Sequence, residues 1–306
     1  TGNVGIGKST FTALTSGDYN IGLGYNSLAA LTTGSYNVAV GASALVTITT
    51  GGDNIAIGRD ALYSTTTAGD NTAVGNWAAR DNTTGASNTF VGSYAGTTNT
   101  TGANLVAIGY GALDANTTAP DNVAVGHSAL GANTTGSNNT AVGYQSLLVN
   151  TTGSQNTSVG EHSLDANTTA SDNTSVGYDA LTSNTTGDKN VAMGRDALLG
   201  NGTGSGNVAI GYFAAKVSNS DSITAVGQYA LSANTAGSNT GFGYKALYTN
   251  TSGANNTAVG ALCLQLNTTG AQNIAMGSRA LFANTTASNN TAVGYYALTA
   301  NTTGAD

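Results

Sequence analysis

The sequence contains little charge and few groups suited to catalysis or redox chemistry. Charged residues make up 8% of the 306 positions, and the formal net charge is -7. The eight Lys and Arg residues are scattered, so no basic surface can follow a phosphate backbone, and nucleic acid is not an expected partner. The single cysteine, Cys263, cannot form an internal disulfide. We expect it to be a small buried apolar residue, with a reactive thiol as the alternative.

Signals for membrane insertion and export are missing too. No run of about 18 apolar residues is present, so we do not expect this segment to insert into a membrane. The first residues do not resemble a signal peptide. Because the chain begins and ends in repeated sequence, we expect either a fragment of a longer protein or a unit that stacks end to end.

A short repeat fills the whole chain. The glycine that follows each apolar run recurs 18 times, at intervals of 17 residues except for two intervals of 16 residues between Gly211 and Gly243. Such a regular period is typical of a solenoid, in which each coil contacts mainly its neighbours. We therefore predict one elongated all-β domain over residues 1–306, a parallel β-solenoid (β-roll) of 18 coils.

The coil from Asn139 to Gln155, NTAVGYQSLLVNTTGSQ, defines columns 1 to 17, and its first five columns predict a strand. Column 2 is Val, Ile or Thr in every coil, and column 4 is always a larger apolar residue. Because strand residues two apart share a face, we expect columns 2 and 4 to lie in the core with the Leu of column 9. The small residues of columns 3, 5 and 8 then predict a second close-packed face, against another wall of the coil or a neighbouring chain. We therefore expect an oligomer.

Three coils lack the large residue of column 9 and carry Ala79, Gly96 or Ala215 there. Each has an aromatic residue two positions earlier. If this second segment is extended, residues two apart share a face, and the rings of these residues lean over the vacated space. The three aromatic residues are Trp77, Tyr94 and Phe213.

Asparagine and glycine columns predict the corners of the coil. Column 1 is Asn in 16 coils and column 12 is Asn in 13, and the NTTG of columns 12 to 15 predicts a turn. At a coil spacing of about 4.8 Å, identical amides fall into register and form hydrogen-bonded ladders. We assign this structural role to Asn122, Asn139, Asn156 and Asn173 of column 1, with Gly126, Gly143, Gly160 and Gly177 of column 5.

Two places break the pattern. In coils 1–3, about residues 1–53, column 12 holds Leu14, Leu31 and Ile48, which predicts a wider core or a junction with a different segment. In the short coils at about 207–238, one residue is missing between Lys216 and Ile223, which predicts a bulge or a local kink without a domain boundary.

Candidates for chemistry are few, and we expect neither an enzyme nor a cofactor. His127 and His162 are the two histidines, and we interpret them as ordinary exposed side chains, with a metal or acid/base site as the alternative. Asp53 and Asp70 share column 17 in adjacent coils and are a weak candidate for cation binding. A repeating calcium motif would need acidic residues in every coil, so weak or absent ion binding is the expectation.

Two columns of side chains are candidate recognition surfaces. Column 6 varies widely and is rich in tyrosine, which binds sugars and protein partners but also packs between coils. Columns 13 and 14 are mostly Thr, as on ice-binding β-solenoids, although a turn would not hold adjacent Thr side chains on one face. The candidate recognition residues are Tyr110, Tyr144, Tyr178 and Tyr212, in a column that also holds Tyr25, Tyr244 and Tyr295.

The runs NVAVG (122–126), NVAMG (190–194) and NIAMG (273–277) resemble the head repeats of trimeric autotransporter adhesins (YadA-like heads) and the repeats of phage tail fibres. The resemblance implies a left-handed β-roll, three chains about one axis, and binding to host matrix or receptors. The coil of that family is shorter than 17 residues, and no neck, heptad stalk or anchor is present. We therefore expect a rigid extracellular attachment segment on a cell or virion surface, which binds a glycan or matrix protein. A self-stacking filament subunit without a receptor is the alternative, and ice binding is a lesser one.

Overall fold

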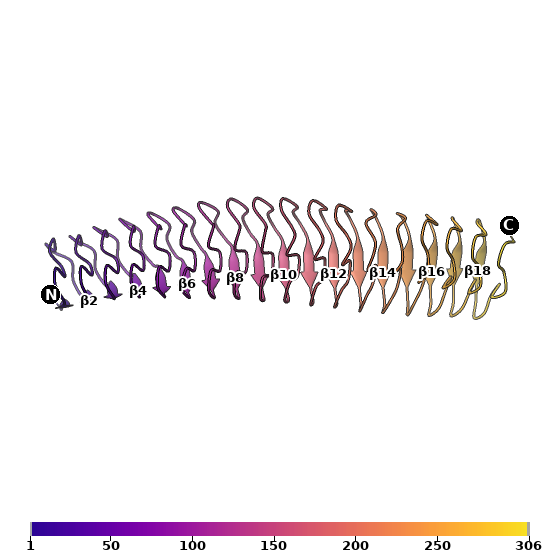
Figure 1. Cartoon of the computed structure of the whole chain (residues 1–306), viewed down its shortest axis with the longest axis horizontal. Coiled ribbons are helices and arrows are strands. Elements are labelled where there is room, and N and C mark those ends of the chain that lie inside the picture. Colours follow the sequence, from indigo (N-terminus) through magenta and orange to yellow (C-terminus); the bar gives the residue numbers. More distant parts are fainter. Residues whose placement is uncertain (1, 305–306) are drawn as a thin grey trace. The chain divides into compact units, whose positions relative to one another are not determined.

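A computed structural model describes residues 2–304 and divides the chain into two units, Thr1–Gln155 and Asn156–Asp306. Each unit contains nine coils, and each coil contributes one three-residue strand (Figure 1). No helix occurs among the described residues, and therefore none of them forms a helix able to cross a membrane. The predicted fold class, a parallel β-solenoid of 17-residue coils, is confirmed.

The strands are shorter than predicted and occupy only columns 2 to 4 of each coil. The first unit contains β1 (Val4–Ile6), β2 (Ile21–Leu23), β3 (Val38–Val40), β4 (Ile55–Ile57), β5 (Thr72–Val74), β6 (Thr89–Val91), β7 (Val106–Ile108), β8 (Val123–Val125) and β9 (Thr140–Val142). The second contains β10 (Thr157–Val159), β11 (Thr174–Val176), β12 (Val191–Met193), β13 (Val208–Ile210), β14 (Thr224–Val226), β15 (Thr240–Phe242), β16 (Thr257–Val259), β17 (Ile274–Met276) and β18 (Thr291–Val293).

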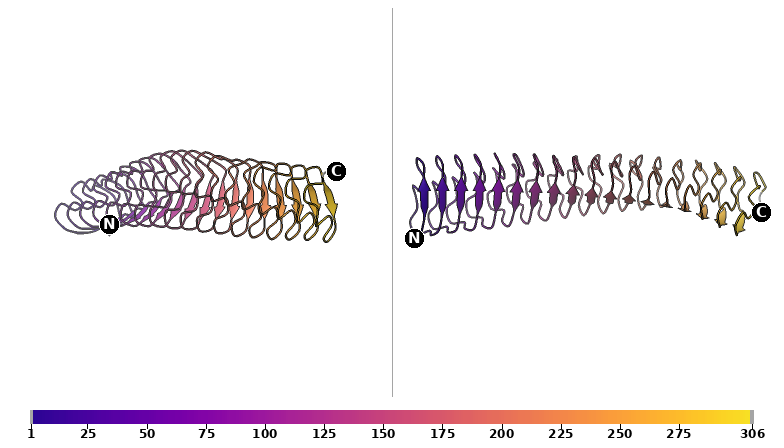
Figure 2. Two further views of the ribbon diagram at one scale, coloured as in Figure 1. Left: turned by 45° about the vertical axis from the view of Figure 1, so that its right-hand side comes forward. Right: turned by 90° about the horizontal axis from the view of Figure 1, so that it is seen from below.

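Within each unit, every strand pairs in parallel with the strand of the next coil, column against column. Val123 of β8 lies opposite Thr140 of β9, for example, and Val125 lies opposite Val142. Figure 2 shows the strands of successive coils on the same side of the coil. Like residues therefore stack on like residues along each unit, which is the arrangement required for ladders of identical side chains.

The strands are turned the opposite way from the prediction. Ala141 of column 3 is fully buried inside the coil, as are the Ala residues of column 3 in the neighbouring coils. Columns 2 and 4 point outward and are half-buried or exposed, as Thr140 and Val142 show. The coil is thin, so only a small side chain fits between the strand and the opposite wall formed by columns 8 and 9. The expectation of a core built from columns 2 and 4 was wrong, and column 3 packs on another wall of its own coil.

The second segment is not extended, which corrects another expectation. Residues of columns 7 and 9 have left-handed backbone conformations, such as Gln145 (φ 53°) and Leu147 (φ 53°). This conformation disfavours L-residues by roughly 1–2 kcal/mol each. It also directs the backbone N–H groups along the stack: Gln145 N donates to His127 O at 3.0 Å, and Leu130 N donates to Ser146 O at 3.0 Å. These hydrogen bonds between coils offset the local strain.

Glycine is required in column 5 by the close approach of successive coils. Gly126 has a φ of 137°, and a Cβ added there would collide with the carbonyl oxygen of Gly143. Gly160 has the same φ of 137° and would collide in the same way with Gly177. The four glycines assigned a structural role thus lie where the backbones of neighbouring coils come into contact.

The rings of Trp77, Tyr94 and Phe213 do not fill the space beneath the missing leucines. Because column 7 is left-handed, these rings lie on the outer surface, where the Trp77 Nε1 donates to Asp60 at 3.1 Å. At Gly96 the vacant space is occupied by the fully buried ring of Phe90, the one large residue in column 3. The expectation was therefore wrong in its geometry, and at Gly96 the compensating residue comes from the strand.

Both asparagine columns form buried ladders. In column 1 the backbone N–H of Asn139 donates to the Asn122 Oδ1 at 2.9 Å, and in the second unit Asn173 donates to Asn156 at 3.1 Å. In column 12 the Asn133 Nδ2 donates to the Asn116 Oδ1 at 3.2 Å and to the carbonyl oxygen of its own turn. Each amide thus links its coil to the next and also closes its own corner.

The irregular coils alter the turns and the core without disturbing the strands. Leu31 and Ile48 are fully buried, so column 12 adds apolar side chains to the core at that end. The one-residue deletion leaves β13 and β14 in register, with Val208 opposite Thr224, and therefore causes no bulge in the sheet. Ser218 replaces an Asn of the ladder there. Among the described residues, the Asn201 Oδ1 is buried without a hydrogen-bond partner.

Candidate functional site

The outward side chains of columns 2 and 4, here called the strand face, form a partly exposed surface of apolar residues and threonine on each unit. No charged residue occurs in either column. Ile57 is 40% exposed, Ile108 is 39% exposed and Phe242 is 51% exposed. Soluble monomers rarely expose contiguous apolar patches larger than a few hundred Å², and larger patches commonly mark contacts with other molecules. This surface was missed in the sequence because columns 2 and 4 were assigned to the core.

A row of aromatic rings, here called the ring row, follows columns 6 and 7 of the first unit. Trp77 packs edge-on against Tyr94 with ring centroids 5.5 Å apart, and Tyr94 packs in the same way against Tyr110 at 5.6 Å. Tyr110 stacks on His127 at 5.2 Å, and His127 lies 5.4 Å from Tyr144. The row exists because coils repeat at nearly the distance at which aromatic rings pack. The candidate recognition residues Tyr110 and Tyr144 are 55% and 45% exposed.

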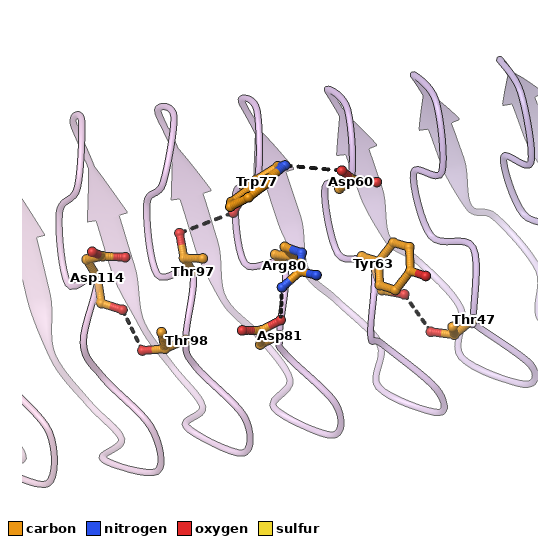
Figure 3. Close-up of polar contacts among 9 residues, drawn as sticks. All are labelled: Thr47, Asp60, Tyr63, Trp77, Arg80, Asp81, Thr97, Thr98 and Asp114. Atoms are coloured by element: carbon orange, nitrogen blue, oxygen red, sulfur yellow. Dashed lines mark hydrogen bonds and ion pairs between the residues drawn. The ribbon is translucent and has the colours of Figure 1, made fainter.

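Arginine extends the ring row at one end (Figure 3). The guanidinium of Arg80 lies 5.1 Å from the Trp77 ring centroid and 5.6 Å from the Tyr63 ring centroid. Arg80 also pairs with Asp81 at 2.9 Å. Planar guanidinium groups stack on aromatic faces, so this end presents a mixed aromatic and charged surface.

Aromatic clusters also lie on the second unit. Tyr212 contacts Phe213 and Tyr229, with ring centroids 4.0 Å and 5.5 Å apart. The Arg195 guanidinium lies 5.3 Å from the ring of Tyr178, which is 44% exposed. Packing between coils and exposure therefore occur together, and the two interpretations of the tyrosine column are not exclusive.

The candidate metal ligands do not converge. Among residues 2–304, no group of three His, Cys, Asp or Glu side chains has a geometry suited to a metal ion. Asp53 and Asp70 are exposed on adjacent coils. The imidazole Nδ1 of His162 lies 3.3 Å from a carboxylate oxygen of Asp165, whereas His127 belongs to the ring row.

Within residues 2–304, the carboxyl groups of Asp114, Asp165 and Asp179 have pKa values above the ordinary value. Partial burial raises the pKa of Asp114, and a hydrogen bond with the Thr97 hydroxyl opposes part of that rise. Burial also raises the pKa of Asp165, with His162 acting in the opposite direction. The pKa of Asp179 is raised by burial and by the nearby Asp196 carboxylate. These groups hold their protons to a higher pH than a free carboxyl does.

The threonine hydroxyl groups of column 13 form hydrogen bonds between coils. The Thr134 Oγ1 of column 13 donates to the carbonyl oxygen of Thr151 at 3.0 Å, and the Thr83 Oγ1 donates to Thr100 at 2.9 Å. Column 14, which includes Thr135, is exposed. The two threonine columns therefore do not form one flat array of free hydroxyl groups.

A hollow of about 370 Å³ lies beside the ring row and was missed in the sequence. Gly111 and Gly131 lie at the hollow, the first as the only glycine of column 7 and the second as the only glycine of column 10. This signal was visible in the repeat. Its meaning depended on knowing that columns 7 and 10 of adjacent coils lie side by side.

No family model matches the chain, and no curated protein matches it.

Proposed function

We propose that this chain is a non-enzymatic fibre segment on a cell or virion surface. It associates with copies of itself through the strand face and attaches to other surfaces through its variable columns. The observation that carries the proposal is the exposed apolar strand face present on both units. A chain with this surface is stabilised by covering it.

The composition of the strand face favours association with an identical chain. Its outward residues are β-branched or apolar in every coil, and Met276 (44% exposed) and Ile210 (38% exposed) contribute large side chains in the second unit. Burial of apolar surface contributes roughly 25 cal/mol per Å², so a long uncharged face provides a strong driving force. A copy of the same chain offers a face with the same coil spacing, which lets side chains interdigitate along its length.

The resemblance to YadA-like heads and phage tail fibres supports the same arrangement. It implies three copies about one axis, a left-handed roll and an extracellular position. Attachment then belongs to the columns that vary, chiefly the exposed tyrosines of column 6. A host glycan or a matrix protein is the proposed partner, since exposed tyrosine supplies a flat apolar face with a hydroxyl group.

A self-stacking filament subunit without a receptor is the alternative, and ice binding is a lesser one. The filament shares the association of copies and differs only in lacking attachment. For ice binding, the hydroxyl groups of column 13 are already engaged with carbonyl oxygens, as Thr134 shows, which weakens the case. A thermal-hysteresis assay with no activity would exclude that function.

The experiment compares two lysine variants with a matched control. Ile108→Lys and Ile210→Lys each place a charge on the strand face, whereas Thr135→Lys places one on exposed column 14. The native chain and the control are expected to associate and to bind immobilised matrix proteins or cultured cells. The two strand-face variants are expected to lose association. Association without binding to any surface would favour the filament, and association unaffected by both strand-face lysines would contradict the proposed interface.

A further inference from the structure

The hollow beside the ring row is a built feature of the first unit. Its volume is about 370 Å³, within the range of small-molecule sites. Residues from four successive coils line it, from Tyr94 at one end to Leu148 and Val149 at the other. Three coil steps of about 4.8 Å give it a length of roughly 14 Å.

Two missing side chains create the hollow. Neighbouring coils place Tyr94 or Ser128 in column 7 and Leu148 in column 10, where the hollow has Gly111 and Gly131. The backbone does not require Gly111, because other residue types adopt the same left-handed conformation at this column, as Tyr94 does with a φ of 63°. A Cβ on Gly111 would have one neighbouring atom within 4 Å, the Ser128 Oγ at 3.7 Å. The space beside Gly111 is therefore open because this residue has no side chain. The backbone conformation of the turn does not require it.

The lining combines an aromatic wall with a few polar groups. Tyr110 is 55% exposed and packs edge-on against Tyr94, so the two rings form a bent wall. Asp114 contributes a half-buried carboxylate, and the Ser128 hydroxyl lies 3.0 Å from the His127 imidazole. Flat apolar surface with hydrogen-bond acceptors beside it matches a sugar ring, which has an apolar C–H face and hydroxyl donors around its edge.

We infer that this hollow binds one or two neutral hexopyranose units of a surface glycan. A neutral sugar fits better than an acidic one, because the Asp114 carboxylate repels anionic groups and accepts hydrogen bonds from hydroxyl groups. A small cation is the competing ligand, since aromatic rings and a carboxylate also attract cations. The length of the hollow and its aliphatic end at Leu148 and Val149 favour the sugar. This inference rests on the proposed attachment function and names its ligand.

The test measures binding of lactose, maltose, cellobiose and choline to the native chain by calorimetry and by NMR shifts of the Gly111 and Gly131 amides. We expect at least one of the three disaccharides to bind with a dissociation constant near the millimolar range and to shift both amides. Gly111→Tyr and Gly131→Leu fill the hollow with residues that other coils carry in the same columns. Each is expected to weaken binding at least about tenfold. Ser43→Tyr, in column 7 outside the hollow, is the control and is expected to bind normally.

A further variant separates the two ligand classes. Asp114→Asn removes the charge and keeps the shape, so it is expected to weaken disaccharide binding only several-fold and would abolish binding of a cation. Binding of choline in place of all three disaccharides, no binding of any disaccharide, or equal affinity in Gly111→Tyr overturns the inference. The mass of each variant in solution and its attachment to cells are measured on the same samples. If cells still bind the chain but no disaccharide does, the sugar site is refuted and the proposed function is not. If the native chain does not associate with copies of itself, the proposed function is refuted.

Discussion

The ring of Phe90 fills the space that a side chain on Gly96 would need. Phe90 is the one large residue of column 3 and is fully buried, and a Cβ on Gly96 would collide with its ring. Column 9 in most other coils holds Leu over a small column 3 residue. This coil therefore exchanges the positions of its large and small residues while keeping the volume of its core.

The exchange predicts strong coupling between the two positions. Phe90→Ala leaves a cavity and is expected to reduce the free energy of unfolding by about 3–5 kcal/mol. Gly96→Leu forces a second large side chain into a filled space and is expected to be destabilising by about 1–3 kcal/mol or more. The double variant restores the arrangement of the other coils and is expected to recover most of the loss. Chemical denaturation of the four proteins measures the coupling, and additive effects would contradict the packing described here.

In the column 12 ladder, we expect that the amide of Asn133 cannot be replaced by a carboxylate without loss of stability. Asn133 donates to the Asn116 Oδ1 and to the Gly136 carbonyl oxygen, and both donors are lost in Asn133→Asp. The variant also places a carboxylate beside two oxygen acceptors in a buried site. We expect the free energy of unfolding to fall by about 3 kcal/mol or more. Asn138→Asp, at an exposed position, is the matched control and is expected to change it by less than about 0.5 kcal/mol. Equal effects of the two changes would show that the ladder does not stabilise the fold.

Cys263 is expected to be chemically silent in the folded protein. Its side chain is fully buried, the Sγ contacts the carbonyl oxygen of Ala275 at 3.1 Å, and burial raises the thiol pKa to about 12. The thiolate is the reactive form, and little of it exists near neutral pH. A thiol reagent at pH 8 should therefore label the native chain very slowly and the denatured chain completely. Rapid labelling of the native chain would place this residue on the surface.

We expect Asp114 to make the stability of the folded chain depend on pH below neutrality. Burial raises the pKa of Asp114 in the folded state, so between its ordinary pKa of 3.8 and that raised value the folded chain holds more protons than the unfolded chain. The contribution of this group is fully present below pH 3.8 and is lost as the pH rises through the raised pKa. Asp114→Asn removes this loss and is expected to give a slightly higher Tm at pH 7. The Tm of both proteins is measured from pH 3 to pH 7. An equal change of Tm with pH in the native chain and in Asp114→Asn would contradict the assignment.

The repeat predicted the architecture because the columns that hold the same residue in nearly every coil are those at which neighbouring coils contact each other. Asn139 and Gly143 recur in nearly every coil, and the structure places these columns where coils meet. The direction of the strand was harder to predict, because both of its faces are apolar. The deciding signal was that Asn139 and Ala141, two residues apart, share one face of the strand. The structure buries both in the thin interior and turns Val142 outward.

Other features left no signal in local sequence preferences. Leu130 adopts a left-handed conformation that leucine rarely favours, and in this conformation its N–H donates to the Ser146 carbonyl oxygen of the neighbouring coil. The conformation of the second segment therefore depends on stacking and not on residue type. The hollow was partly visible, since Gly111 and Gly131 stand alone in their columns. Their adjacency became apparent only in three dimensions.

We propose that copies of the same chain cover the strand face. The most direct test is the mass of the unmodified protein by sedimentation equilibrium across micromolar concentrations. A mass of two or more whole chains, with three expected, and a shift to one chain in Ile108→Lys would support this association. A single chain at every micromolar concentration would contradict it.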